Sequence, residues 1–422
     1  MSATLDRAAP SAPAPPLPPQ TIWLPVLVWV AVYAIPAITS LQPISEYDTW
    51  WHLRTGQWIV AHAAIPHTDP FTSFGAGRPW VAYSWLFGLM LYGLYQSLGL
   101  LGIVGYRVVL TLAVIAALHR LIARRGASFA VTAGLVAAAA VALTPLLVAE
   151  RPGLITILFC TLTLDAVLDL REGRATWAVW LLPLCYALWA NVHVQFVHGL
   201  FLLGLAWVAP PVDRLLNLRT VGHADTWGAR DWWRLTALGA ACFLATFLNP
   251  YGPWVYSVVR EYAGQKATYG IFAELKAMDF RELSDWFVLG LLGAAAYALG
   301  RRPLRSAFPV LLLAAGAYFS FHAKHDLWFV VLAACAVVAE RRPLGQGLPT
   351  VPAAPTEGLP HRREARETFG RWRGRVRRPC HSRCPHLPRD SSSRTFSSSF
   401  LVARMPSGSL SFRPSYSTPT NP

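Results

Sequence analysis

Residues 46–80 concentrate side chains that could move protons, ligate a metal or grip a phosphate. The stretch reads EYDTWWHLRTGQWIVAHAAIPHTDPFTSFGAGRPW and directly follows the first long apolar run. Its polar groups, set among Trp50, Trp51, Trp58 and Trp80, are Glu46, Asp48, His52, Arg54, His62, His67 and Asp69. Most of the remaining first 345 residues read as apolar helix, so we expect the chemistry in this stretch.

Asp48 is the first catalytic candidate, because it stands a few residues beyond the apolar run and beside two tryptophans. Partial desolvation there would raise the pKa of the carboxylate and suit it to accept a proton. Glu46 is the second candidate, since a neighbouring carboxylate can share that proton or a divalent metal. In a plainer interpretation Trp50 and Trp51 belong to an interfacial aromatic belt and the charges are solvated. The run of mixed charge favours the functional interpretation.

Two cationic or polar side chains of the same stretch are candidates for binding a phosphate. His52 follows Asp48 by four residues, which places both on one face of a helix. The planar guanidinium group of Arg54 could bind a phosphate through two parallel hydrogen bonds. A local salt bridge to Glu46 or Asp48 explains the presence of Arg54 in this stretch equally well.

Besides proton transfer and phosphate binding, this stretch could form a metal site. Glu46, Asp48, His67 and Asp69 offer the oxygen and nitrogen donors that could hold a divalent ion such as Mg or Mn. The run His67-Thr68-Asp69-Pro70 is equally typical of a structural Asx turn.

Further candidates stand at helix boundaries later in the chain. Arg151, His193, Lys324 and His325 are expected on the same membrane face as Asp48, where they could bind substrate or its phosphate. Each also has a structural interpretation. Pro152 after Arg151 is typical of a helix start, and a single histidine at a helix boundary is often only a satisfied interface residue.

The composition indicates a polytopic membrane protein. Of 422 residues 54% are hydrophobic and only 14% are charged, against about a quarter charged in soluble domains. The formal charge of +15 does not indicate nucleic-acid binding, because residues 343–422 hold 13 Arg, no Lys and four acidic residues, which is +9 of it. Phosphate-binding loops, dinucleotide fingerprints, HExxH and GxSxG motifs do not occur in the sequence.

We predict an all-α transmembrane fold over residues 21–342 with about ten spanning helices. A long first outer loop, 43–100, contains an interfacial helix, and a second long outer loop covers 250–284. The predicted spans are 21–42, 101–119, 128–147, 153–170, 176–190, 197–211, 235–249, 285–300, 304–321 and 326–340.

The orientation depends on segment 81–100, which is apolar enough to span. If it instead lies along the outer surface, the shorter loops hold 14 basic residues and the longer outer loops hold eight. Basic residues accumulate in cytoplasmic loops. We therefore predict a bacterial cytoplasmic membrane protein with both termini in the cytoplasm and residues 46–80 outside.

The two ends of the sequence differ from the body. Residues 1–20 are rich in Pro and Ala, which predicts disorder. Residues 343–422 are rich in Arg, Ser and Pro and have no apolar period. They are interpreted as a disordered cytoplasmic tail or, alternatively, as the product of a shifted reading frame.

The run Asp48-Thr49-Trp50-Trp51-His52-Leu53-Arg54 resembles the first outer loop of oligosaccharyltransferase catalytic subunits. The acidic pair is similar to that of protein mannosyltransferases and lipid A aminoarabinose transferases. The chain thus resembles membrane glycosyltransferases of the GT-C class over residues 21–342. The WWDYG signature of oligosaccharyltransferases is missing, and Tyr47 separates Glu46 from Asp48. The resemblance therefore supports the GT-C class but identifies no substrate.

This resemblance implies sugar transfer from a polyprenyl-phosphate donor to an unidentified acceptor on the outer face, with Asp48 as the base. The alternative is a polytopic transporter or flippase for an anionic or lipid-linked substrate. A transporter is expected to place its polar residues near the membrane midplane on repeated halves. In this sequence most of them gather at one face, which favours the enzyme.

Overall fold

The computed structural model describes residues 20–174, 177–218, 229–264 and 275–340. The predicted disordered start, except for Gln20, and the whole Arg-rich tail, 343–422, for which a shifted reading frame is the alternative interpretation, lie outside the described residues. Within the described ranges the regular elements are helices, and extended pairing is limited to two isolated bridges, Thr68 with Pro79 and Asp69 with Ala76. The all-α prediction is confirmed for this part of the chain.

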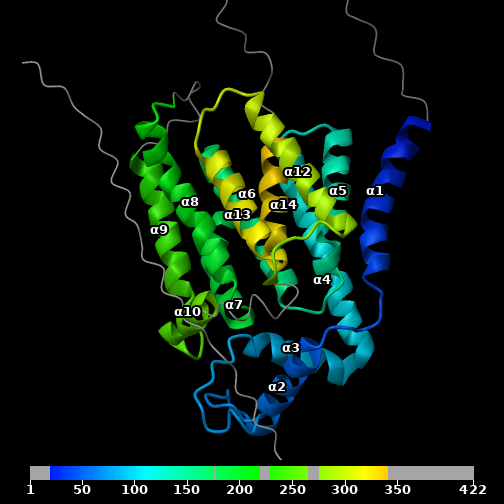
Figure 1. The fold of residues 1–422 in the computed structure, drawn as a ribbon, viewed down its shortest axis with the longest axis vertical. Helices are drawn as coiled ribbons and strands as arrows, with labels where there is room; N and C mark the ends of the chain where they lie inside the picture. Colours follow the sequence, from blue (N-terminus) through cyan, green and yellow to red (C-terminus); the bar gives the residue numbers. More distant parts are fainter. Residues whose placement is uncertain (1–19, 175–176, 219–228, 265–274, 341–422) are drawn as a thin grey trace, which may run out of the picture. The chain divides into compact units, whose positions relative to one another are not determined.

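Each of the ten segments predicted to span contains a helix. In chain order these helices are α1 (Gln20–Thr39), α4 (Leu100–Ala123), α5 (Phe129–Leu147), α6 (Gly153–Arg171), α7 (Leu182–Val192), α8 (Phe196–Leu215), α9 (Ala229–Ala245), α12 (Leu283–Gly300), α13 (Phe308–His322) and α14 (Leu327–Ala339). Shorter elements join them: η1 (Trp177–Leu181), η2 (Gly252–Trp254), α10 (Val255–Gly264) and η4 (Lys324–Asp326). The helices pack as a bundle (Figure 1).

Five of these helices are long and apolar enough to cross a membrane: α4, α5, α6, α8 and α12. Three shorter apolar helices cover Trp23–Thr39, Val179–Val192 and Phe308–His322. By length and composition, these helices indicate an integral membrane protein.

The centre of the bundle is α14, in which every residue except Val338 is buried. Its sequence, LWFVVLAACAVVA, is apolar on all sides, and such a helix is buried among other helices or in lipid. Contacts with α4, α5, α6, α12 and α13 provide that enclosure. The central helix begins one residue after Asp326, so its packing fixes the position of the turn that carries His325.

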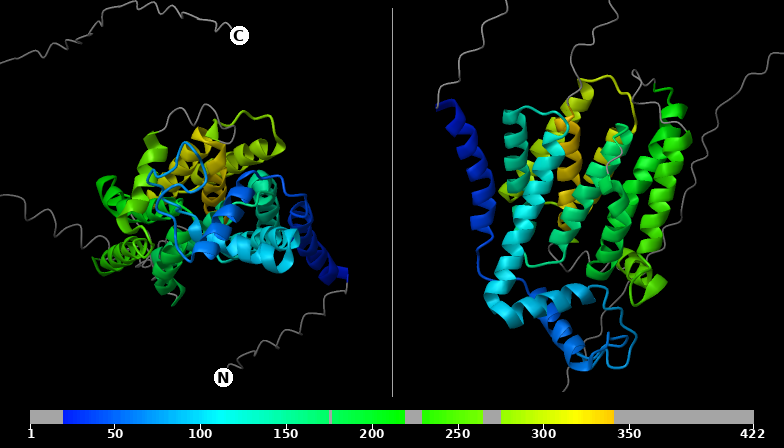
Figure 2. Two further views of the ribbon diagram at one scale, coloured as in Figure 1. Left: turned by 90° about the horizontal axis from the view of Figure 1, so that it is seen from below. Right: turned by 180° about the vertical axis from the view of Figure 1, so that it is seen from behind.

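Helices α2 (Asp48–His62) and α3 (Trp85–Leu98) lie together at one end of the bundle (Figures 1 and 2). They cross at Gly56 and Gly88, where a Cβ on Gly56 would collide with the carbonyl oxygen of Gly88, and one on Gly88 would lie 2.8 Å from the carbonyl oxygen of His52. Two glycines therefore allow the backbones to touch. Segment 81–100 forms α3 beside α2 and not a helix of the bundle, in agreement with its prediction as part of the first loop.

Acidic and basic side chains pair at the opposite end of the bundle. Arg124 donates to Asp165 at 2.7 Å and to Asp169 at 2.6 Å, and Arg125 contacts the same two carboxylates. The last turn of α14 lies at this end too, because Arg302 donates to the carbonyl oxygen of Val337 at 3.1 Å. The start of α1 is also there (Figure 1). The described chain thus begins and ends away from α2, as the predicted topology requires.

Candidate functional site

The site forms where the first loop meets three interhelical turns at the α2 end of the bundle. Glu46 lies just before α2 and Arg151 lies in the α5–α6 turn. The Arg151 guanidinium donates from Nη2 to Oε1 of Glu46 at 2.7 Å. The Glu46 and Arg151 side chains retain only 14% and 22% exposure, so water screens this ion pair weakly.

A second, fully buried ion pair lies behind the first. Arg107 in α4 binds Glu150, and neither side chain is exposed. Arg107 also donates to the carbonyl oxygens of Ser40, Gln42 and Val148. One guanidinium thus ties the chain after α1, which leads to Glu46, to the chain after α5, which leads to Arg151.

Asp48 opens α2 with an exposed side chain. Its charge acts on Tyr83, whose pKa is raised well above the usual value, mainly by burial, then by the neighbouring Tyr262, and to a smaller extent by Asp48. The Tyr83 and Tyr262 hydroxyl oxygens are 3.3 Å apart. The Arg151 charge opposes the shift of Tyr83, so Tyr83 lies within the electrostatic reach of both Asp48 and Arg151.

His52 lies one helical turn after Asp48, and its ring meets Phe87 of α3 edge-on at 4.7 Å. The pKa of His52 falls from 6.5 to about 4, chiefly through burial and then through the positive charge of Arg151, with Glu46 acting in the opposite direction. At neutral pH this imidazole is therefore uncharged. It can exchange hydrogen bonds in the site without adding positive charge to it.

His193, directly after α7, is held from inside the bundle. Its Nδ1 is 2.8 Å from the hydroxyl of Thr156 in α6, and this hydroxyl accepts a hydrogen bond from the Trp189 indole at 3.0 Å. Burial is the main cause that lowers the pKa of His193 well below its usual range, and electrostatic coupling to the neighbouring histidines His325 and His52 is a smaller cause. Histidines from three separate segments thus lie near one another.

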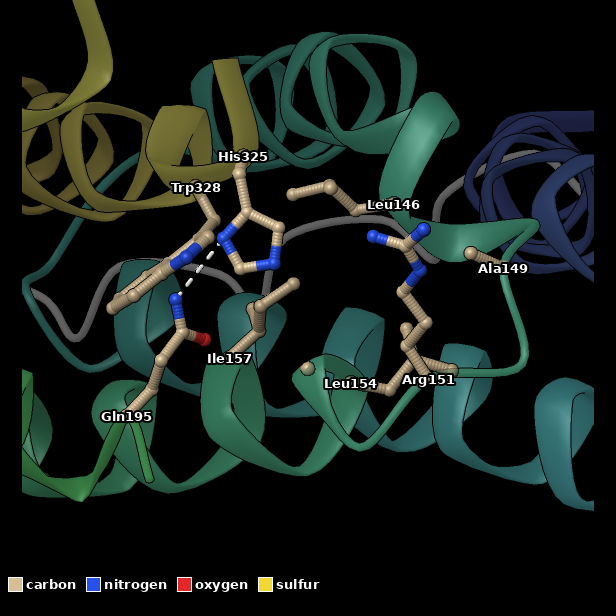
Figure 3. A pocket seen from close by; sticks show the side chains of 9 residues that line it. Leu146, Ala149, Arg151, Leu154, Ile157, Gln195, His325 and Trp328 are labelled. Carbon is tan, nitrogen blue, oxygen red and sulfur yellow. Dashed lines mark hydrogen bonds between the residues drawn. The ribbon is translucent and has the colours of Figure 1, made fainter. Parts of the chain in front are cut away.

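The α8 start and η4 supply the remaining polar groups. Gln195 donates from Nε2 to Oδ1 of Asp326 at 2.9 Å, and the same nitrogen is 3.1 Å from Nδ1 of His325. His198 lies 3.7 Å from the other Asp326 oxygen. A small pocket borders this network (Figure 3), and the residues that line it are Leu146, Ala149, Arg151, Gly153, Leu154, Ile157, Gln195, His325 and Trp328.

Two predicted phosphate-binding residues point elsewhere. Arg54 is exposed on the outer face of α2, where it donates to Gln57 at 2.7 Å. Lys324 binds Glu282 at 3.0 Å and Asp285 at 3.4 Å, at the start of α12. Lys324 therefore pairs with acidic groups of its own, and neither Arg54 nor Lys324 has a contact with the other predicted site residues among these interactions.

The predicted metal set is not assembled. Asp69 folds into an Asx turn in which its carboxylate accepts hydrogen bonds from the Phe71 amide at 2.8 Å and from the Thr72 hydroxyl. His67 is exposed and packs edge-on against Tyr251 at 5.1 Å. Within the described ranges, three or more His, Cys, Asp or Glu side chains do not gather where they could hold a metal ion. The donor set of Glu46, Asp48, His67 and Asp69 therefore does not fit a Mg or Mn ion.

Sequence reasoning passed over several residues of the site. Asp326 stood in a turn that the sequence marked, but its neighbours Lys324 and His325 were chosen as the binding groups. Gln195 and Tyr83 were not chosen, although Gln195 lies two residues before the predicted helix 197–211 and Tyr83 lies in the predicted first outer loop, 43–100. What could have identified them is their position near the predicted outer membrane face, because neither residue type by itself indicates a functional site.

No family model matches the sequence, and a search of curated proteins finds no relative. A functional assignment for this chain therefore depends on its own residues and their geometry.

Proposed function

We propose that this chain is an integral-membrane glycosyltransferase that moves a sugar from a polyprenyl-phosphate donor to an acceptor hydroxyl. The supporting observation is the meeting of six of the eight predicted catalytic and binding residues at one end of the bundle. They are Glu46, Asp48, His52, Arg151, His193 and His325. They come from the first loop and three other turns, and such convergence is typical of a catalytic site.

In the proposed reaction Asp48 is the general base. Asp48 is exposed at the first position of α2. The acceptor hydroxyl oxygen attacks the anomeric carbon as the bond from that carbon to the phosphate oxygen breaks. The hydroxyl proton passes to Asp48, and the lipid phosphate leaves with both electrons of the broken bond.

Arg151 is the proposed contact for the donor phosphate. A guanidinium presents five N–H donors in a planar fork, and this geometry suits phosphate oxygens. Glu46 holds the guanidinium in place. His325 lines the same pocket as Arg151, and a neutral imidazole there would donate a further hydrogen bond to phosphate oxygens.

For the membrane arrangement we propose ten crossings, both termini in the cytoplasm of a bacterium, and the α2 end outside. The Arg-rich end opposite α2 supports this orientation through the distribution of basic residues. In a protein without its native cysteines, a cysteine at Gly173 should resist an impermeant thiol reagent added outside, and one at Gly264 should react. The reverse pattern would contradict the orientation.

The decisive experiment is sugar transfer by Asp48→Asn in membranes supplied with a radiolabelled polyprenyl-phosphate sugar. The amide keeps the size of the side chain but cannot take the proton, so transfer should fall by about 10²–10⁴-fold at matched expression. The matched control is Asp69→Asn, because Asp69 serves a turn and its oxygen can still accept the Phe71 amide. Wild-type turnover by Asp48→Asn would remove Asp48 from the mechanism.

A transporter for an anionic or lipid-linked substrate is the second candidate, and one observation favours it. The polar network around His193 and Thr156 extends from the site into the bundle, and ionisable groups inside a membrane bundle often line a substrate path. A transporter would move the labelled lipid across proteoliposome membranes without transferring its sugar. The two candidates therefore separate in one assay that follows both lipid and sugar.

A further inference from the structure

Thr156 in α6 uses its side-chain hydroxyl differently from the other buried threonines of that helix. Thr161 and Thr163 donate to carbonyl oxygens four residues earlier in α6, at 2.7 and 2.8 Å. Such a bond serves the helix itself. The Thr156 hydroxyl instead leaves the helix and lies 3.0 Å from the Trp189 indole nitrogen and 2.8 Å from Nδ1 of His193. Its role therefore concerns α7 and the residue that follows α7.

The hydrogen of the Thr156 hydroxyl has one acceptor. The Trp189 indole only donates, so the Thr156 oxygen accepts from it with one lone pair. Thr156 is fully buried, and among the described residues its one further side-chain partner is Nδ1 of His193. If Nδ1 carried a hydrogen, the hydroxyl would accept twice and its own hydrogen would be buried without an acceptor, which is costly. Thr156 therefore donates to Nδ1.

This chain of hydrogen bonds determines the tautomer of His193. Burial lowers the pKa of His193 well below its usual range, so the ring is neutral at neutral pH and carries one N–H. Since Nδ1 accepts, the hydrogen is on Nε2. Among the described residues Nε2 has no hydrogen-bond partner, and it is not fully buried. His193 thus presents an N–H donor on the side of its ring that faces away from Thr156.

The Nε2 donor belongs to the outer-face site. The charged and titratable neighbours of the His193 ring come from α2, the first loop, α8 and η4, and they are His52, Tyr83, His198, His325 and Asp326. The ring centroids of Tyr83 and His193 are 6.5 Å apart, and the charges of Asp48 and Arg151 act on Tyr83. An N–H held in such a site can stabilise an anionic oxygen. A ring nitrogen that already carries its hydrogen cannot serve as a base.

We infer that Thr156 is a positioning residue: with Trp189 it holds His193 with the hydrogen on Nε2, and this N–H donates to a phosphate oxygen of the bound substrate. The inference rests on the proposed function only in taking that oxygen from the lipid phosphate. Thr156 and Trp189 are fully buried and act through His193. His193 is the hydrogen-bond donor, while Asp48 is the base.

Nitrogen-15 NMR of the histidine-labelled, full-length protein in detergent tests the hydrogen positions without any transfer reaction. The His193 signals are those missing from a His193→Gln variant. At pH 7.5 the wild type should show a protonated Nε2 and an Nδ1 that accepts a hydrogen bond. Thr156→Val removes the hydroxyl at similar size and should shift the Nδ1 signal, while Thr156→Ser should keep it. A protonated Nδ1 in the wild type overturns the inference.

Sugar transfer in membranes at matched expression tests the positioning role. Thr156→Val should lower transfer about 10-fold, the effect of one lost hydrogen bond, and Thr156→Ser should restore it to within about two-fold of the wild type. The matched control is Thr161→Val, because Thr161 is also fully buried in α6 and its hydroxyl serves its own helix. This control should transfer near the wild-type rate. Equal losses in the two valine variants would reduce Thr156 to a structural residue.

Two replacements of His193 separate a donor from a base. Glutamine keeps an N–H donor but cannot take up a proton, whereas alanine offers neither. With His193 as the donor, His193→Gln should retain about 10-fold more transfer than His193→Ala. Equal transfer by the two variants would overturn the donor role.

Melting temperatures establish which variants are folded. If Thr156→Val does not fold, Trp189→Phe decides the question, because it keeps a buried ring but removes the indole N–H. The Thr156 hydroxyl could then accept from His193, so a second set of His193 signals with the hydrogen on Nδ1 should appear. A single unchanged set would overturn the role of Trp189 and Thr156.

Farnesyl phosphate tests the contact with phosphate. Added to the labelled wild type, it should shift the His193 Nε2 signal, and farnesol, which lacks the phosphate, should not. An equal shift with inorganic phosphate would assign the contact to free phosphate, and an unmoved signal with every probe would overturn it. Failure of the proposed function gives a different result: absence of sugar transfer in the wild type would leave the tautomer and the farnesyl phosphate shift unchanged.

Discussion

Glu46 and Arg151 are 105 positions apart in the sequence, and their side chains meet at 2.7 Å. This pair joins the first loop to the α5–α6 turn and fixes the direction of the guanidinium. The separation also means that neither partner could be inferred from its local sequence.

Arg151→Lys should lower sugar transfer, since an ammonium cannot bind Glu46 and a phosphate with the same planar fork. We expect a loss of roughly 10- to 100-fold, the equivalent of one hydrogen bond to a charged group. Arg54→Lys makes the same chemical change on the exposed face of α2 and should keep near wild-type transfer. Transfer assays on both variants in membranes at matched expression compare them, and equal losses would contradict the separate placement of these two arginines.

Gly88→Ala should separate α2 from α3 and disturb the position of His52. An added Cβ would lie 2.8 Å from the His52 carbonyl oxygen, a backbone atom that cannot move without α2. Alanine elsewhere in a helix is favoured over glycine by about 1 kcal/mol. Gly93→Ala is the matched control, because it lies in the same helix with open space around its Cβ. Melting temperatures should fall for the first variant and stay level or rise for the second, and the opposite order would count against the crossing.

Arg107 and Glu150 should be strongly coupled in a double-mutant cycle. Either Arg107→Met or Glu150→Gln leaves a buried charge without its partner, which typically costs about 3–5 kcal/mol. The double variant should lose less than the sum of the two single variants, because it leaves neither charge unpaired. Unfolding in detergent measures the three changes. Additive losses would mean that the backbone carbonyls around Arg107, and not Glu150, account for its effect.

Stability should decrease as the pH falls from about 6.5 toward 4, and His52 should account for part of the decrease. The pKa of His52 drops from 6.5 to about 4 on folding, so in this window the unfolded chain binds a proton that the folded chain does not. Stability therefore rises with pH across the window and levels off above it. Since one pKa unit corresponds to 1.36 kcal/mol, the contribution of His52 is at most about 3 kcal/mol.

His52→Gln should flatten the dependence of the melting temperature on pH between 4.5 and 7.5. The control is His67→Gln, because His67 is exposed and its replacement should leave the slope unchanged. Parallel curves for the wild type and His52→Gln would show that other groups cause the acid sensitivity. His193, which is also buried with a lowered pKa, is the next group to replace.

The helical architecture and the marked turns could be read from the sequence. Apolar runs separated by polar turns determine helices locally, because a helix satisfies its own backbone hydrogen bonds within the segment. For this reason each of the ten predicted ranges overlaps a helix, and His67-Thr68-Asp69-Pro70 could be recognised as an alternative Asx turn, which Asp69 forms. The distribution of basic residues predicted that 81–100 belongs to the first loop and does not span the membrane.

Only the tertiary structure decided which polar side chains share a site. Arg54 and Lys324 are cations at the predicted face, as Arg151 is, yet one turns outward on α2 and the other binds Asp285 at the start of α12. Gln195 joins the site because its helix places it between His325 and Asp326. The direction of a side chain at a helix end depends on the rotation and neighbours of that helix. These are set by packing between segments a hundred or more residues apart, and no local pattern encodes them.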